Sequence, residues 1–313
     1  VPKLLDIIHD ILSGSKRVFA LSGSSARRLK QKGINLMAGR ASVYRMYPLM
    51  QSELKSDFDL ARALERGLLP EAYLANANEE AFEYLKSYIY TYIEKEIQQE
   101  QWVRKIEPFR KFLNLAAQMN SKIINKSKIA RQIGVESSTI ESYFEILEDT
   151  LLGFRIPGFE TSARKQIQTA DKFYFIDVGI VRAIEKTLSH PMVEHNSYYG
   201  SLFETHIVLE IRKLIEYRRW DWSLNYLRTK NNVEIDLVVS RPQKSPILIE
   251  IKSSRSVSEE DIKALVTLGA DIDKKLRKPS PKILISQDPM TREIGPVSCI
   301  YYSELESILD GLA

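Results

Sequence analysis

The sequence contains one cysteine, Cys299, and no apolar run close to the roughly 20 residues that a membrane-spanning helix requires. It also lacks a positively charged start followed by an apolar segment and a cleavage site, which a secreted protein would carry. One cysteine cannot form an internal disulfide, so nothing points to an oxidising compartment. With 44% hydrophobic and 27% charged residues, the composition excludes transmembrane and fibrous proteins. We therefore expect a globular protein in the cytoplasm, with no membrane partner.

The sequence also has no large excess of positive or negative residues. The chain has 45 basic and 41 acidic residues, a net charge of only +4, so any contact with nucleic acid would come from local patches. Its 313 residues are about twice a typical domain length. We expect an α/β chain of the mixed α+β kind, divided into residues 1–77, 78–185 and 186–313.

The N-terminal part is predicted to contain short elements. Residues 1–12 have the spacing of an amphipathic helix and no initiator methionine, so we expect an interior piece of a longer protein. Residues 17–22 form an apolar strand pattern that leads through Gly-Ser-Ser into a helix. Such a turn can cradle an anion on free N–H groups, although an ordinary capped turn explains the same residues. Residues 39–47 alternate like a second strand.

The middle of the chain has a helical pattern. Residues 78–102 carry apolar side chains at three- and four-residue spacing, with a tyrosine stripe that we interpret as packing. Residues 106–159 then have the layout of a winged helix-turn-helix. Its helices are expected at 109–119, at 125–134 with a glycine at the end, and from a Ser137-Ser-Thr cap to 147. A strand at 172–177 and a helix at 178–185 follow.

The charges of this module argue against sequence-specific DNA reading. A recognition helix lies beside dense phosphate charge, yet the third helix is acidic and has no lysine or arginine between Ser137 and Leu152. We therefore expect packing or protein docking ahead of DNA reading. The residues that could still hold a nucleic-acid backbone are Lys126, Lys128, Arg131, Arg155, Arg164 and Lys165.

Chemistry is predicted between residues 200 and 254. A helix at 201–215 carries Glu204 near its start, and strands are expected at 224–228, 233–239 and 247–252. Residues two apart on a strand point to the same side. Asp236, Glu250 and Lys252 can therefore meet at one edge of the sheet.

Such a group can support phosphodiester hydrolysis. Two carboxylates and a backbone carbonyl suit a hard cation such as Mg²⁺, and a lysine can orient or deprotonate the attacking water. A solvated sheet edge with acidic and basic side chains is the alternative for an isolated Glu-x-Lys.

The order Glu204, Asp236, then Glu250-Ile-Lys252 on helix, strand and strand resembles the PD-(D/E)XK or restriction-endonuclease-like superfamily. The resemblance implies that Asp236 and Glu250 bind Mg²⁺ or Mn²⁺, that Lys252 helps to activate water, and that Glu204 assists the metal site. The fold would be completed by a helix at 258–268, begun by a Ser-x-x-Asp cap, and by strands at 282–286 and 297–302.

The whole chain resembles a prokaryotic family of AAA+-like ATPases that carry a large C-terminal domain of unknown function. The residues that carry this resemblance are Leu21–Ser25, Gly39, Arg40, Tyr47–Leu49, Tyr88–Ile97, Phe175–Gly179, Gly200–Glu204, Tyr226–Lys230, Val233–Asp236 and Ile249–Lys252. The resemblance implies that residues 1–77 are the remnant of an ATPase domain, 78–185 a long helix plus winged helix, and 186–313 the nuclease-like domain.

No Gly-x-x-x-x-Gly-Lys-Ser/Thr motif occurs in the chain, so we expect no ATP hydrolysis and place ATP only in a full-length form. By resemblance, Ser24 would be a polar sensor residue and Arg40 a phosphate-contacting or intersubunit arginine. Surface or capping roles explain both residues equally well.

Three functional hypotheses follow from these patterns. The first is a Mg²⁺- or Mn²⁺-dependent nuclease that hydrolyses DNA phosphodiesters. The second is a regulatory module that binds nucleic acid or protein without cutting. The third is a nucleotide-responsive remnant that uses Ser24, Arg27 and Arg40.

Overall fold

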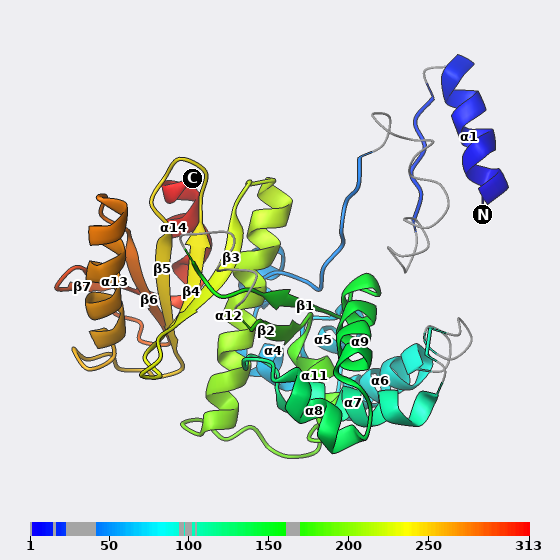
Figure 1. Ribbon diagram of the computed structural model, residues 1–313, viewed down its shortest axis with the longest axis horizontal. Coiled ribbons are helices and arrows are strands. Elements are labelled where there is room, and N and C mark those ends of the chain that lie inside the picture. Colours follow the sequence, from blue (N-terminus) through cyan, green and yellow to red (C-terminus); the bar gives the residue numbers. More distant parts are fainter. Residues whose placement is uncertain are drawn as a thin grey trace.

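The computed structural model describes residues 2–14, 17–22, 42–93, 97, 102–103, 105–160 and 170–313. Its helices and two β-sheets give the mixed α+β class that the sequence predicts (Figure 1). Within these described ranges, no helix is both long and apolar enough to cross a membrane.

Short helices make up the N-terminal part. They are α1 (Pro2–Gly14), α3 (Gln51–Leu54), the 3₁₀ turn η2 (Lys55–Asp57), α4 (Leu60–Arg66), α5 (Pro70–Tyr73) and α6 (Asn78–Thr91). The strand predicted at 17–22 is wrong, and so is the one predicted at 39–47 in its described part, residues 42–47, because neither described segment is a strand. An alternating pattern becomes a strand only where a neighbouring strand receives its backbone hydrogen bonds. In the described chain neither segment has such a neighbour.

The helices predicted between residues 106 and 185 lie where the sequence places them, whereas the helix predicted at 78–102 ends at Thr91 as α6. The elements are α7 (Ile106–Gln118), α8 (Lys126–Ile133), α9 (Ser137–Asp149), β1 (Gly153–Ile156), β2 (Lys172–Phe175) and α11 (Val178–Glu185). The Asn125 side chain caps α8, and Gly134 ends it with a φ of 80°. The predicted Ser137 cap is wrong, because Glu136 is the N-cap residue of α9 and its side chain makes no capping hydrogen bond.

The C-terminal part is a six-stranded mixed sheet with helices on both sides. Its elements are α12 (Ser197–Arg218), β3 (Ser223–Arg228), β4 (Glu234–Ser240), β5 (Ile247–Lys252), α13 (Lys263–Leu276), β6 (Lys282–Ser286), β7 (Arg292–Ile294), β8 (Val297–Tyr301), the 3₁₀ turn η4 (Tyr302–Glu304) and α14 (Leu305–Leu312). The strand order is β3-β4-β5-β6-β8-β7, antiparallel from β3 to β5 and parallel from β5 through β6 to β8.

The sheet lies between α12 on one face and α13 on the other (Figure 1). Strand β5 shows why: Ile249 and Ile251 join the core that contains α12, whereas Leu248 joins the core that contains α13. Glu250 and Lys252 have the same parity as Leu248. The alternation that the sequence predicts for this strand is therefore confirmed.

Helix α13 begins later than predicted. The Ser258 backbone N–H and hydroxyl both donate to one Asp261 carboxylate oxygen, at 2.9 Å each. These bonds close a turn, and the helix starts only at Lys263 and continues to Leu276. The predicted span of 258–268 is therefore wrong at both ends.

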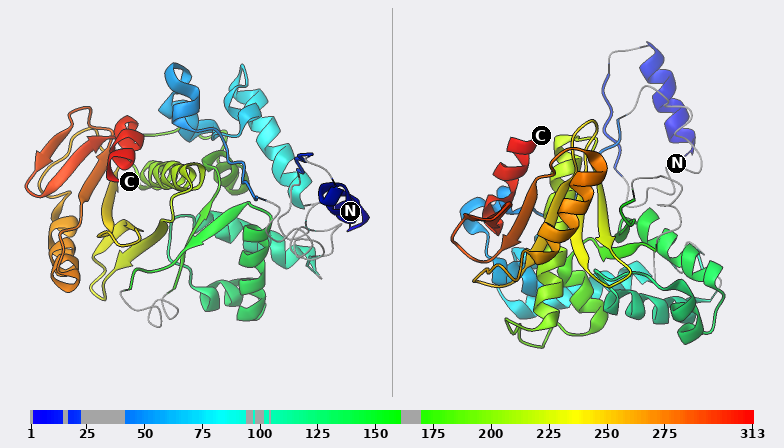
Figure 2. Two further views of the ribbon diagram at one scale, coloured as in Figure 1. Left: turned by 90° about the horizontal axis from the view of Figure 1, so that it is seen from above. Right: turned by 60° about the vertical axis from the view of Figure 1, so that its left-hand side comes forward.

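The three parts share packing and polar contacts. Asp177 caps α11 and also accepts a hydrogen bond from the Leu68 backbone N–H. Gly67, with a φ of 75°, allows this approach, because a Cβ there would overlap the Asp177 carboxylate. One buried core runs from Met50 through the middle helices to Leu309. Figure 2 shows α12 end-on between the large sheet and the helices of the N-terminal half.

Hairpin β1–β2 is fastened to the large sheet, which positions the site described next. Gly158 forms a parallel bridge with Tyr226 of β3, and the Tyr226 hydroxyl donates to the Ala170 carbonyl at 2.5 Å. Asn120 adds a second link, since it donates to Thr205 of α12 at 2.7 Å. The end of β2 is thereby held against α12 and β4.

Candidate active site

A cavity of about 430 Å³ lies where β2, the start of α12, the start of β4 and the end of β5 meet. Its lining includes Lys172, Glu204, Glu234, Asp236 and Lys252. Four separate elements thus contribute charged side chains to one concave place, which is typical of a binding or catalytic site.

The Glu-x-Lys strand meets its neighbour β4 at Asp236, beside an irregularity where Ile235 and Leu237 pack on opposite faces of the sheet. The Lys252 ammonium donates to Glu250 Oε1 at 2.7 Å, and the Ile251 backbone N–H donates to Asp236 Oδ2 at 2.8 Å. Glu250 is 5% exposed, and its Oε2 is buried with no hydrogen-bond partner among the described residues. A buried carboxylate oxygen without a partner is costly, so it points to a missing cation or donor.

Glu204 of α12 lines the same cavity. Two side chains of β2 contact its carboxylate. The Tyr174 hydroxyl donates to Glu204 Oε1 at 2.7 Å, and the Lys172 ammonium lies 3.5 Å from the same oxygen. Tyr174 is fully buried. Three residues of the predicted chemical group, Glu204, Asp236 and Lys252, therefore line one cavity, and the fourth, Glu250, is buried next to it and accepts a hydrogen bond from Lys252.

Two charged residues of the site were missed by the sequence argument. Lys172, only 3% exposed, pairs with both Glu204 and Glu234, and its ammonium lies 5.4 Å from the ring centre of Tyr226. The available signal was a lysine two residues before a tyrosine in the otherwise apolar strand Lys-Phe-Tyr-Phe, since both then point to one side.

Burial and crowded negative charge raise the pKa values of the carboxyls. Burial is the largest cause for Glu204, whose pKa rises to about 7 with Asp236 adding to the effect and Lys172 opposing it. Burial and then Asp236 raise the pKa of Glu250 to about 8, against the effect of Lys252. Burial also raises the pKa of Asp236. Near neutral pH these shifts favour the protonated, uncharged form of Glu250 and leave Glu204 partly protonated.

The two lysines respond in the complementary way. Burial would lower the pKa of Lys172, but Glu204, Asp236 and Glu234 together outweigh burial and raise it. Glu250 and Asp236 likewise raise the pKa of Lys252 against burial. Both ammonium groups are therefore charged at neutral pH.

The donors present fit a divalent cation of the Mg²⁺ type. Asp236 and Glu250 supply oxygen only, and one Glu250 oxygen has no hydrogen-bond partner among the described residues. Among the residues with described positions, no three His, Cys, Asp or Glu side chains form a group that could hold a metal ion. Mg²⁺ is usually held by one or two carboxylates and keeps several waters, so Asp236 and Glu250 are the two protein ligands that it would use here.

Two of the side chains that were predicted to contact nucleic acid, Arg155 and Lys126, already pair with acidic side chains of α9. The Arg155 side chain is 18% exposed and pairs with Glu141 at 2.5 Å and Glu148 at 2.6 Å. Lys126 pairs with Glu141 at 2.8 Å, while Lys128 and Arg131 are exposed on α8. The remaining candidates, Ser24, Arg40, Arg164 and Lys165, lie outside the described residues.

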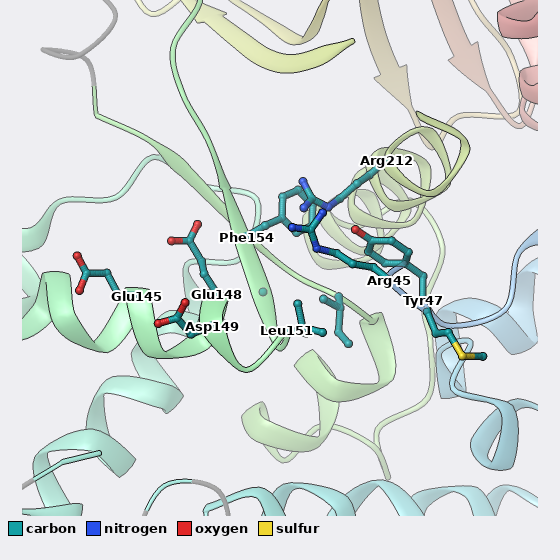
Figure 3. A pocket seen from close by; sticks show the side chains of 11 residues that line it. Arg45, Tyr47, Glu145, Glu148, Asp149, Leu151, Phe154 and Arg212 are labelled. Atoms are coloured by element: carbon teal, nitrogen blue, oxygen red, sulfur yellow. The ribbon is translucent and has the colours of Figure 1, made fainter. Parts of the chain in front are cut away.

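A second cavity, of about 370 Å³, lies between α9, β1, α12 and the segment around Tyr47 (Figure 3). Acidic side chains from the end of α9 line one side of it, and Arg45 and Arg212 line the other. The Arg212 guanidinium lies 4.0 Å from the ring centre of Phe154. Arg45 pairs with Glu216 at 3.1 Å.

Comparison with known proteins gives similarities without an assigned activity. Residues 57–190 match the model of a domain of unknown function, DUF8612, and residues 199–304 match that of another, DUF4143. Uncharacterized proteins of Mycobacterium bovis and Mycobacterium tuberculosis are each 24% identical over 252 residues. The alignment covers 80% of this chain and 56% of each relative, so the chain spans about half their length. No solved structure matches the chain.

Proposed function

We propose that the cavity formed by α12, β2, β4 and β5 is a Mg²⁺- or Mn²⁺-dependent nuclease site that hydrolyses DNA phosphodiesters. The observation that carries the proposal is the buried carboxylate oxygen of Glu250, without a hydrogen-bond partner among the described residues, next to a cavity that Asp236 and Lys252 line. The sequence of elements supports it: one helix, three antiparallel strands, a second helix and a parallel strand resemble the PD-(D/E)XK core.

Each side chain has a role that its surroundings allow. Asp236 and Glu250 would hold the cation, which when bound supplies charge neutralisation for the phosphodiester. The charged Lys252 ammonium suits orienting the attacking water and stabilising the negative charge that develops, because Glu250 keeps it protonated. Glu204, with a pKa of about 7, can hold or release a proton near neutral pH.

A cleavage assay tests this proposal. The purified protein is incubated with single-stranded, nicked and duplex DNA in Mn²⁺, in Mg²⁺ and in EDTA, beside Asp236→Ala and Lys252→Ala. Lys263→Ala, an exposed lysine of α13 outside the cavity, is the matched control. We expect metal-dependent products that fall by about 100-fold or more in the two site variants and not in the control. Products that persist in Asp236→Ala would contradict the proposal.

The charge distribution of the middle module favours a second function, protein docking. Helix α9 presents acidic side chains to the second cavity (Figure 3), and its Glu141 and Glu148 already neutralise Arg155. If DNA is bound, Arg155→Gln should therefore leave the salt dependence of binding unchanged in fluorescence anisotropy. A slope smaller by about one unit would show instead that Arg155 contacts a phosphate. ATP enters our proposal only through a longer form of the protein.

A further inference from the structure

The ammonium of Lys172 occupies an unusual place in the candidate active site. It comes from β2, outside the helix and strands that supply the other charged groups, and reaches between Glu204 of α12 and Glu234 of β4. Only 3% of this residue is exposed. A buried ammonium in such a place is retained only when carboxylates compensate its lost hydration.

The surroundings fix this ammonium firmly. Tyr226 lies beneath it, with the ring centre 5.4 Å away, and the backbone of Lys172 pairs with Ile156 in the hairpin and with Ile123 beside α7. Tyr174, two residues along β2, donates to the same Glu204 oxygen. One strand of the middle module thus sets both the charge and the orientation of Glu204.

Acidic side chains crowd around Lys172. Its ammonium pairs with Glu204 and Glu234 and is influenced by Asp236, whereas Glu250 pairs with the partly exposed ammonium of Lys252. The guanidinium of Arg228 lies 3.8 Å from the Glu234 carboxylate. A cation that enters the cavity is attracted by the remaining negative charge and repelled by Lys172.

We propose that Lys172 is a positioning residue that acts as a built-in cation of this site: it holds Glu204 and Glu234 when no divalent ion is bound and weakens the binding of that ion. This inference rests on the proposed function, because it assigns Lys172 a role toward the same divalent cation. The site is then built from two parts of the chain: β2 supplies the Lys172 ammonium, and α12 and β4 supply the carboxylates that it pairs with.

The inference is tested by Mn²⁺ binding, measured by calorimetry and electron paramagnetic resonance, and by thermal unfolding in Mn²⁺ and in EDTA. Lys172→Met should bind Mn²⁺ about ten-fold or more tightly than the wild type, because a nearby positive charge is gone. Its melting temperature should also rise more on adding Mn²⁺. Lys172→Arg, which keeps the charge, should behave like the wild type. Lys122→Met removes an exposed lysine from the same cavity and should change Mn²⁺ affinity little.

Each outcome decides between the alternatives. If Lys172→Met unfolds in EDTA but folds in Mn²⁺, the ion has replaced the ammonium and the inference stands. Equal or weaker Mn²⁺ binding by Lys172→Met, or a failure to fold even in Mn²⁺, overturns it. Asp236→Ala separates the two proposals: if the wild type binds Mn²⁺ through Asp236 while Lys172→Met gains nothing, only the inference fails. If no protein binds Mn²⁺, the metal site of the proposed function fails as well.

Discussion

Glu250→Gln should make the metal-free protein more stable at alkaline pH while it removes the cation site. The folded-state pKa of Glu250, about 8, lies above that of an unfolded glutamate. A raised carboxyl pKa adds stability that is fully present below the unfolded pKa and is lost as pH rises through the folded one. As pH rises from about 6 to about 8, the free energy of unfolding of the wild type should therefore fall by about 2 kcal/mol because of the Glu250 carboxyl.

Urea unfolding in EDTA, followed by circular dichroism at a series of pH values, measures this effect. The loss of about 2 kcal/mol should be missing from Glu250→Gln and present in Glu259→Gln, a control at an exposed acid outside the cavity. With Mn²⁺ the wild type should show the reverse trend, because cation binding requires the deprotonated carboxylates and tightens as pH rises. The reasoning is refuted if Glu250→Gln and the wild type lose stability in parallel.

Three further changes test the packing that supports the site. Burial lowers the pKa of His206 to about 4, so stability is lost as pH falls from about 6.5 toward that value; His206→Phe should avoid a loss of about 2 kcal/mol in urea unfolding near about pH 5. Lys213→Met leaves a buried carboxylate of α12 without its cation and should cost about 3–5 kcal/mol in chemical unfolding; a smaller loss than about 1 kcal/mol would contradict this. Gly67→Ala combines a positive φ with overlap on Asp177, whereas Gly134→Ala has the positive φ alone, so Gly67→Ala should lower the melting temperature much further.

Local patterns were sufficient to predict the group on β4 and β5. Glu250 and Lys252 lie on a strand whose alternation is visible in the sequence, and antiparallel pairing places Asp236, at the start of β4, beside the end of that strand. The α12 helix around Glu204 was equally visible from its apolar spacing. Their roles in chemistry stay predictions, because geometry alone does not reveal catalysis.

What the sequence missed depends on contacts between distant segments. Lys172 reaches Glu204 and Glu234 only because β2 pairs with β1 and is fastened to β3, and no local pattern encodes that docking. The start of α13 was misplaced for a different reason. The Ser258 and Asp261 pair looks like a helix cap, yet its hydrogen bonds close a separate turn before the helix.

The central claim is that Asp236 and Glu250 hold a divalent cation, and locating that ion tests it most directly. Crystals grown with Mn²⁺ and measured near the manganese absorption edge would show the ion as an anomalous difference peak. We predict a peak between the Asp236 and Glu250 carboxylates, lost in Asp236→Ala. A map with no peak there, or with Mn²⁺ bound only elsewhere, would contradict the account.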